Sequence, residues 1–200
     1  MVSEPRNANI VRVPTQRNTR EENKDIKEGK SISSWSTAKK RQKDTDARWT
    51  KKNGTSFFGY KNHVSIDVSH KFIRSYDVTD ASVHDSQVFT ELLDPSNTSR
   101  DVWADSAYRS DNSLAKLKQQ GFREHIQRKG CRHKKLTSWE QRGNRSRAKV
   151  RCRIEHVFGV MAMRTGSTVM RGIGIVRIKA KIGLRNMAYN MTRYAMLAGT

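Results

Sequence analysis

The sequence is short of apolar residues, cysteine and acidic side chains, and each shortage excludes a class of protein. Apolar residues make up 34% of the chain, and no apolar run approaches the about 20 residues that a membrane-spanning helix needs. The two cysteines, Cys131 and Cys152, form no CxxC pair and have no metal-ligand spacing, so we expect reduced thiols. The N-terminus has no apolar segment of the signal-peptide kind. We therefore expect a cytoplasmic protein without membrane contact.

Positive charge is what the sequence has in excess. Lys and Arg number 40 against 19 Asp and Glu, which gives a net charge of +21. Because charges of one sign repel each other, a polyanionic partner explains this composition. Nucleic acid fits best, since binding to its phosphates releases counterions. A basic structural protein would have the same imbalance, so charge alone does not identify a function.

Two regions of the chain differ in composition. Residues 1–56 are polar and highly charged and predict an arm or extended loop, with a short strand near residues 9–14. Residues 57–200 have the alternation and periodicity of a folded core. The expected elements are a hairpin of strands at 57–68 and 71–78, a helix at 84–93, a strand at 101–107, a helix at 110–120, a strand at 122–126, a long helix from about 145, and a well-buried helix at 176–197. This order predicts an α/β fold with a mixed sheet flanked by helices.

Asp105 is the first candidate for chemistry. It ends the predicted strand in DVWADSAY, where open α/β sheets place their functional groups. A carboxylate beside Val102, Trp103 and Ala104 is costly to bury unless it is paired or bound to a metal. The structural alternative is a helix N-cap or a turn residue.

Glu155 is the second candidate, inside the predicted long helix. Val150, Ile154, Val157 and Met161 form one apolar stripe beside it. The spacing of Arg147, Arg151 and Glu155 places them on one helical face. In the structural alternative, the three side chains form a solvated ladder of ion pairs. In the functional alternative, the Glu155 carboxylate lies at the edge of the sheet and the two arginines bind a phosphate.

Other acidic residues have a structural interpretation. Asp85 follows His84 at a predicted helix start, where a negative charge is favoured by the helix dipole. Asp44 and Asp46 could neighbour a site, but they lie in the polar stretch.

The run DVWADSAYRS, followed by Arg151 and Glu155 in RCRIE, resembles the second acidic residue and the glutamate of insertion-sequence DDE transposases, closest to the insertion-sequence-five group. Further segments are similar to the same family: DTDARWTKKNGTSFFGYKNHV, VTDASVHDSQVF, EHIQRKG and KAKIGLRNMAYNM. The resemblance extends over nearly the whole chain. It implies an RNase H-like catalytic core that cleaves and joins DNA during transposition.

The resemblance also implies the chemistry of the site. In this family two divalent ions, Mg²⁺ or Mn²⁺, clamp an in-line displacement at phosphorus, and hard ions of this kind prefer carboxylate ligands. Asp105 and Glu155 would be metal ligands and catalytic residues. The partners would be transposon-end and target DNA, bound by a homo-oligomer, with nucleoid association when DNA is bound. The residues expected to contact phosphates are Lys51, Lys52, Lys61, Arg147, Lys149 and Arg151.

One departure from the family concerns its first catalytic aspartate. That residue lies on the first strand, before the segment that matches residues 1–13, and Glu4 is the only acid among the first 20 residues here. We therefore expect an N-terminally truncated core that lacks its first strand and first carboxylate. A decayed element, one half of a split reading frame and a mis-assigned start would each explain it. Our hypothesis is that the isolated chain does not cleave DNA, and the alternative function is a catalytically inactive remnant that binds DNA or a transposase.

Overall fold

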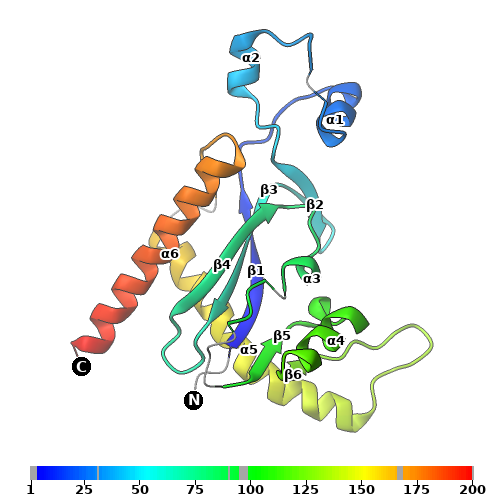
Figure 1. The fold of residues 1–200 in the computed structure, drawn as a ribbon, viewed down its shortest axis with the longest axis vertical. Coiled ribbons are helices and arrows are strands. Elements are labelled where there is room, and N and C mark those ends of the chain that lie inside the picture. The colour runs from blue at the N-terminus through cyan, green and yellow to red at the C-terminus, as the bar shows by residue number, and fades with distance from the viewer. Residues whose placement is uncertain (1–3, 31, 90, 95–98, 166–168, 200) are drawn as a thin grey trace.

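A six-stranded sheet forms the centre of the molecule (Figure 1). The computed structural model describes residues 4–30, 32–89, 91–94, 99–165 and 169–199. The strands are β1 (Glu4–Arg12), β2 (Arg48–Lys52), β3 (Thr55–Ile66), β4 (Ile73–Asp80), β5 (Asp101–Ala104) and β6 (Arg123–Ile126). Their order is β2-β3-β1-β5-β6, with β4 also paired to β3. The predicted mixed sheet, with an antiparallel hairpin and short parallel strands, is confirmed, and it is consistent with an RNase H-like core.

The N-terminal strand β1 occupies the middle of this sheet. It pairs antiparallel with β3 and parallel with β5. We expected the first strand of the family to be missing and residues 1–56 to form an arm or extended loop with one short strand near residues 9–14, but β1 and β2 both belong to the sheet. The first half of β1 is polar, so its residues do not alternate between apolar and polar as in a typical half-buried strand. This half is a strand because it pairs with β3 and β5, which lie far along the chain. Its second half is apolar, and Val11 is buried there.

The hairpin of β3 and β4 follows the predicted alternation. Tyr60, Val64 and Ile66 are buried on one face of β3, together with Asn62. His63 and Ser65, which point to the opposite face, are also buried, so both faces of this strand are covered. The sheet is therefore an internal layer at this point.

Helices cover both faces of the sheet (Figure 1). The helices of the described residues are α1 (Arg20–Lys27), α2 (Thr37–Gln42), α3 (Asp85–Val88), the 3₁₀ helix η1 (Ser106–Tyr108), α4 (Asp111–Gln119), α5 (Ser138–Thr165) and α6 (Ile175–Ala198). Of these, α1 and α2 lie beyond the end of the sheet rather than over a face (Figure 1). On one face, Val64 packs with Ile154 and Val157 of α5, and Tyr60 packs with Ile178 of α6. The other core cluster joins β5 and β6 to the segments around α3 and α4, through residues Phe89, Val102, Ala104, Leu117 and Ile126.

Two helices have bounds that differ from those expected. The long helix was expected to begin at about residue 145, but α5 begins at Ser138. The reason is a reciprocal cap in TSWE: the N–H of Glu140 donates to Thr137 Oγ1 at 3.2 Å, and the N–H of Thr137 donates to Glu140 Oε2 at 2.9 Å. The helix expected at 84–93 is shorter, since α3 covers only Asp85–Val88.

One side of α6 is exposed, contrary to the expectation of a well-buried helix. Leu184, Met187 and Met191 are 62%, 53% and 65% exposed. The opposite side, with Ile178 and Ile182, is fully buried against the sheet. Among the described helices, none is both long enough and apolar enough to cross a membrane.

Candidate functional site

Asp105 lies directly after β5 and caps η1. Its Oδ1 accepts a hydrogen bond from the N–H of Ser106 at 2.6 Å, and its backbone is still extended. Alternate residues of a strand point to opposite faces, and Val102 and Ala104 pack toward α4. Asp105 therefore follows on the face of the sheet that α5 covers, and α5 packs against β5. The N-cap role that we considered as an alternative is present, and it orients the carboxylate at the end of the strand.

Glu155 lies in the middle of α5, one residue from the buried Ile154. Its side chain is 51% exposed, and its Oε1 accepts a hydrogen bond from Arg151 Nη1 at 2.6 Å. Ile154 anchors the helix to β3, so Glu155 lies beside the contact between α5 and the sheet. The arginine holds the carboxylate in a defined position on the solvent side of that contact.

The register of β1 identifies a position that sequence reasoning missed. In the parallel ladder, Arg6 pairs with Ala104, so position 7 is the next neighbour of Asp105. On its other side, Asn7 pairs with Val64, which packs against α5. Adjacent strands are about 4.8 Å apart. Position 7 is thus the place in the central strand closest to Asp105, and it holds an asparagine rather than a carboxylate. Nothing local in the sequence points to this residue, since only long-range pairing brings it to the site.

The remaining acidic candidates have structural roles. Asp44 is buried, and its Oδ1 accepts hydrogen bonds from Tyr60 Oη at 2.7 Å and from the N–H of Ala47 at 3.1 Å. Asp46 Oδ2 accepts the N–H of Ile175 at 2.8 Å and so caps the start of α6. These contacts hold Asp44 and Asp46 in fixed positions, although we expected this part of the chain to be an arm or extended loop.

The pair His84 and Asp85 is structural, as we inferred. His84 is the N-cap of α3 and accepts the N–H of Ser86 through Nδ1. Asp85 forms an ion pair with Lys61 at 2.8 Å, and both side chains are largely buried. Lys61 also donates to the carbonyl oxygen of Val83 at 2.7 Å, so its ammonium is already engaged within the protein.

The other residues expected to contact DNA fall into two places. Lys51 and Lys52 are exposed on the edge strand β2, and Lys149 is exposed on α5. Arg147 is half-buried, and its Nε and Nη1 atoms have no hydrogen-bond partner within the described protein. Arg151 is held by Glu155. The α5 residues therefore lie beside the candidate site, whereas the β2 residues lie at the far edge of the sheet.

Asp105 and Glu155 carry side chains that suit divalent metal ions, because carboxylate oxygens are the ligands that Mg²⁺ and Mn²⁺ prefer. Among the described residues, however, no group of three or more His, Cys, Asp or Glu side chains could hold a metal ion. Both side chains are thus of the kind that these ions prefer, and the neighbouring position 7 holds an asparagine.

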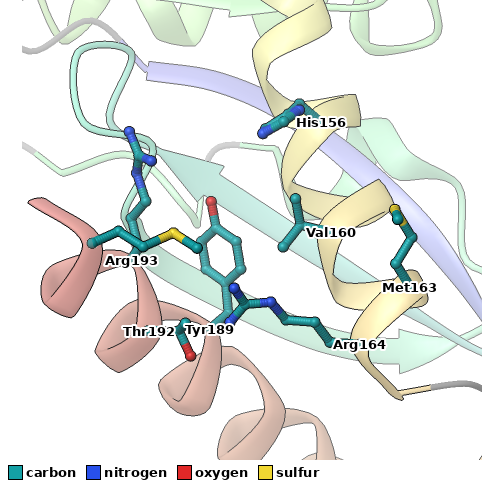
Figure 2. A pocket seen from close by; sticks show the side chains of 8 residues that line it. His156, Val160, Met163, Arg164, Tyr189, Thr192 and Arg193 are labelled. Atoms are coloured by element: carbon teal, nitrogen blue, oxygen red, sulfur yellow. The ribbon is translucent and has the colours of Figure 1, made fainter.

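A separate groove lies between α5 and α6. It has a volume of about 350 Å³, with Val160, Met163 and Tyr189 as apolar lining and Arg164 and Arg193 at its sides (Figure 2). His156 lines it next to Glu155 in sequence, but neither candidate carboxylate does. The candidate site is therefore distinct from this apolar groove.

Comparison with known proteins agrees with these features. The family model described as the transposase DDE domain matches residues 14–191. The chain is similar to the transposase for insertion sequence element IS1106 from Neisseria meningitidis serogroup B, with 31% identity over 153 residues. That alignment covers 76% of this chain, and the chain spans about half of the relative (53%). No solved structure matches the chain significantly. The family match over most of the chain shows that it belongs to the transposase DDE domain family.

Proposed function

We propose that this chain is the DNA-processing core of an insertion-sequence transposase, which cleaves DNA and transfers the cut strand with Asp105 and Glu155 at its centre. The observation that supports it is the position of Asp105 at the end of β5, on the face covered by the helix that carries Glu155. A protein of this function would act in the cytoplasm, on chromosomal DNA. Assembly as a homo-oligomer on transposon ends is part of the same proposal.

In this proposal the two carboxylates hold Mg²⁺ or Mn²⁺. A bound ion would act as a Lewis acid toward the phosphate and the attacking oxygen. Ser106 and Arg151 fix the two carboxylates through one oxygen each. Arg147 and Lys149, on the same helix as Glu155, neutralise phosphate charge and keep the DNA strand against the site.

A second candidate function is DNA binding without cleavage. Asn7 favours it, because an amide has no negative charge and is a weaker ligand for a hard cation than a carboxylate. A site that lacks one of its carboxylates binds metal less tightly and stabilises less charge in the transition state. We therefore expect the chain as it stands to bind DNA but to cleave it very slowly.

The substitution Asn7→Asp tests both candidates. We expect Mn²⁺-dependent cleavage of a labelled linear duplex to rise at least about tenfold over the parent chain, because position 7 adjoins Asp105 in the sheet. Adding Asp105→Ala or Glu155→Ala to this variant should abolish the gain. The control is Asn9→Asp, which places a carboxylate two residues further along β1, opposite Asn62.

Three outcomes separate the candidates. A gain that depends on both Asp105 and Glu155 supports the catalytic function. DNA binding without cleavage in a folded Asn7→Asp variant supports the second candidate. Equal gains for Asn7→Asp and Asn9→Asp contradict a specific role for position 7.

A further inference from the structure

The loop between β6 and α5 forms a basic cavity outside the candidate site. Its volume is about 330 Å³. The cationic residues that line it are Arg109, Arg128, Lys129, Lys134 and Lys135. The remaining lining residues are Cys131, Leu136 and Glu140.

The loop is held in place by the backbone and by α5. Cys131 and Lys134 exchange backbone hydrogen bonds at 3.0 and 3.1 Å, which closes a tight turn. At the base of the loop, Asn144 pairs with the backbone of Arg128 through bonds of 2.9 and 2.8 Å. The Arg128 guanidinium also lies over the ring of Trp139, 5.4 Å from its centroid. The lysines on this loop are therefore kept together rather than free to separate.

The positive charge of the cavity exceeds what its carboxylate can neutralise. Glu140 accepts a hydrogen bond from Arg128 Nη1 at 3.0 Å, and the pKa of this carboxyl is lowered by its bonds to Thr137 and Arg128. Arg109 is paired with Glu124 at 3.1 Å. In the described part of the chain, Lys129, Lys134 and Lys135 have no ion-pair partner. A concave surface of one sign concentrates its field, so an anion is favoured there.

The cavity is connected to the candidate site through η1. Asp105 begins this 3₁₀ turn and Arg109 ends it. The turn itself spans three residues, so only a short stretch of chain separates Asp105 from the cavity.

We propose that this cavity binds one backbone phosphate of the DNA strand that passes over Asp105, close to the reacting phosphate. The inference rests on the proposed function, because it requires a DNA substrate at Asp105. It adds a phosphate-binding subsite on the loop between β6 and α5, in addition to the phosphate contacts proposed for Arg147 and Lys149 on α5.

The test is a salt titration of DNA binding by the double variant Lys134→Gln/Lys135→Gln. We expect the slope of log K against log salt to fall in magnitude by about 1, which corresponds to one lost phosphate contact. The matched control is Lys116→Gln/Lys118→Gln. These two lysines are exposed on α4, outside the cavity, and their loss changes the net charge by the same amount. The slope of this control should stay within experimental error of the parent.

The outcomes distinguish the subsite from the proposed function. If the parent chain does not bind duplex DNA, the proposed function fails and the subsite fails with it. If the parent binds but both double variants have the same slope, only the subsite is overturned. Binding of inorganic phosphate that Lys134→Gln/Lys135→Gln abolishes, without a change in the DNA slope, would also overturn it, because the cavity would then hold free anions only.

Discussion

At the scale of single residues, the buried carboxylate of Asp44 has a specific partner in the core. Tyr60 Oη donates to Asp44 Oδ1 at 2.7 Å within the core. Burial raises the pKa of Tyr60 far above its ordinary value, and the hydrogen bond to Asp44 adds to this effect. The phenol therefore stays protonated and keeps donating to the carboxylate. Asp44 therefore has a structural role in the core.

His63 is the buried residue with the clearest consequence for pH. Its side chain is fully buried, and Nε2 lies 2.9 Å from Thr79 Oγ1. Burial lowers the pKa of His63 to about 4. The unfolded chain takes up this proton near pH 6.5, whereas the folded chain does so only near its lowered pKa. The contribution of His63 to stability is therefore complete above about pH 6.5 and is lost as pH falls toward 4.

We expect the free energy of unfolding to be about 2 kcal/mol lower at pH 5 than at pH 7 on account of this residue. Urea unfolding at the two pH values measures the difference. In His63→Gln the decrease should be smaller by about that amount, since glutamine does not titrate. An equal decrease in both proteins would show that other groups account for it.

At the scale of elements, the close approach of β1 and β3 depends on a glycine. Gly59 has φ +150°, and a Cβ there would clash with the carbonyl oxygen of Val11. Its partner in the ladder is Arg12, and its own carbonyl oxygen accepts the N–H of Ala81 at 3.1 Å. A side chain at this position would push the central strand away from its neighbour.

We expect Gly59→Ala to lower the free energy of unfolding by more than about 2 kcal/mol, through backbone strain and the clash. The control is Gly159→Ala on α5, where a Cβ would have nothing within 4 Å. This change should be neutral or stabilising by up to about 1 kcal/mol, because alanine is the better helix former. Chemical denaturation of both variants checks the pair, and similar stabilities would contradict the role given to Gly59.

Most elements could be predicted from the sequence because their signals are local. The alternation in β3 and the stripe of Ile154, Val157 and Met161 in α5 both match the buried faces of the structure. The start of α5 also has a local signal in the sequence, the capping pair Thr137 and Glu140. The exposed side of α6 could not be predicted from the sequence, because it depends on how much of the helix the sheet covers.

At the scale of the whole molecule, the candidate site combines segments far apart in the sequence. Asp105 and Glu155 could each be singled out, from a strand end, a helix face and a family resemblance. Their relation to Asn7 could not, because it follows from the parallel pairing of β1 with β5. The expected loss of the first strand was wrong for the same reason, since β1 fills the central place. The strand is present, and its residue at position 7 is an asparagine.

The most direct test of the account is to measure the binding of Mn²⁺ to the purified chain by electron paramagnetic resonance. If Asp105 and Glu155 hold one ion together, Asp105→Ala and Glu155→Ala should each weaken its binding by about tenfold or more, and Asn7→Asp should strengthen it. The opposite effect expected for Asn7→Asp, tighter rather than weaker Mn²⁺ binding, serves as the internal control. Mn²⁺ binding that is the same in the parent and both alanine variants would contradict the account.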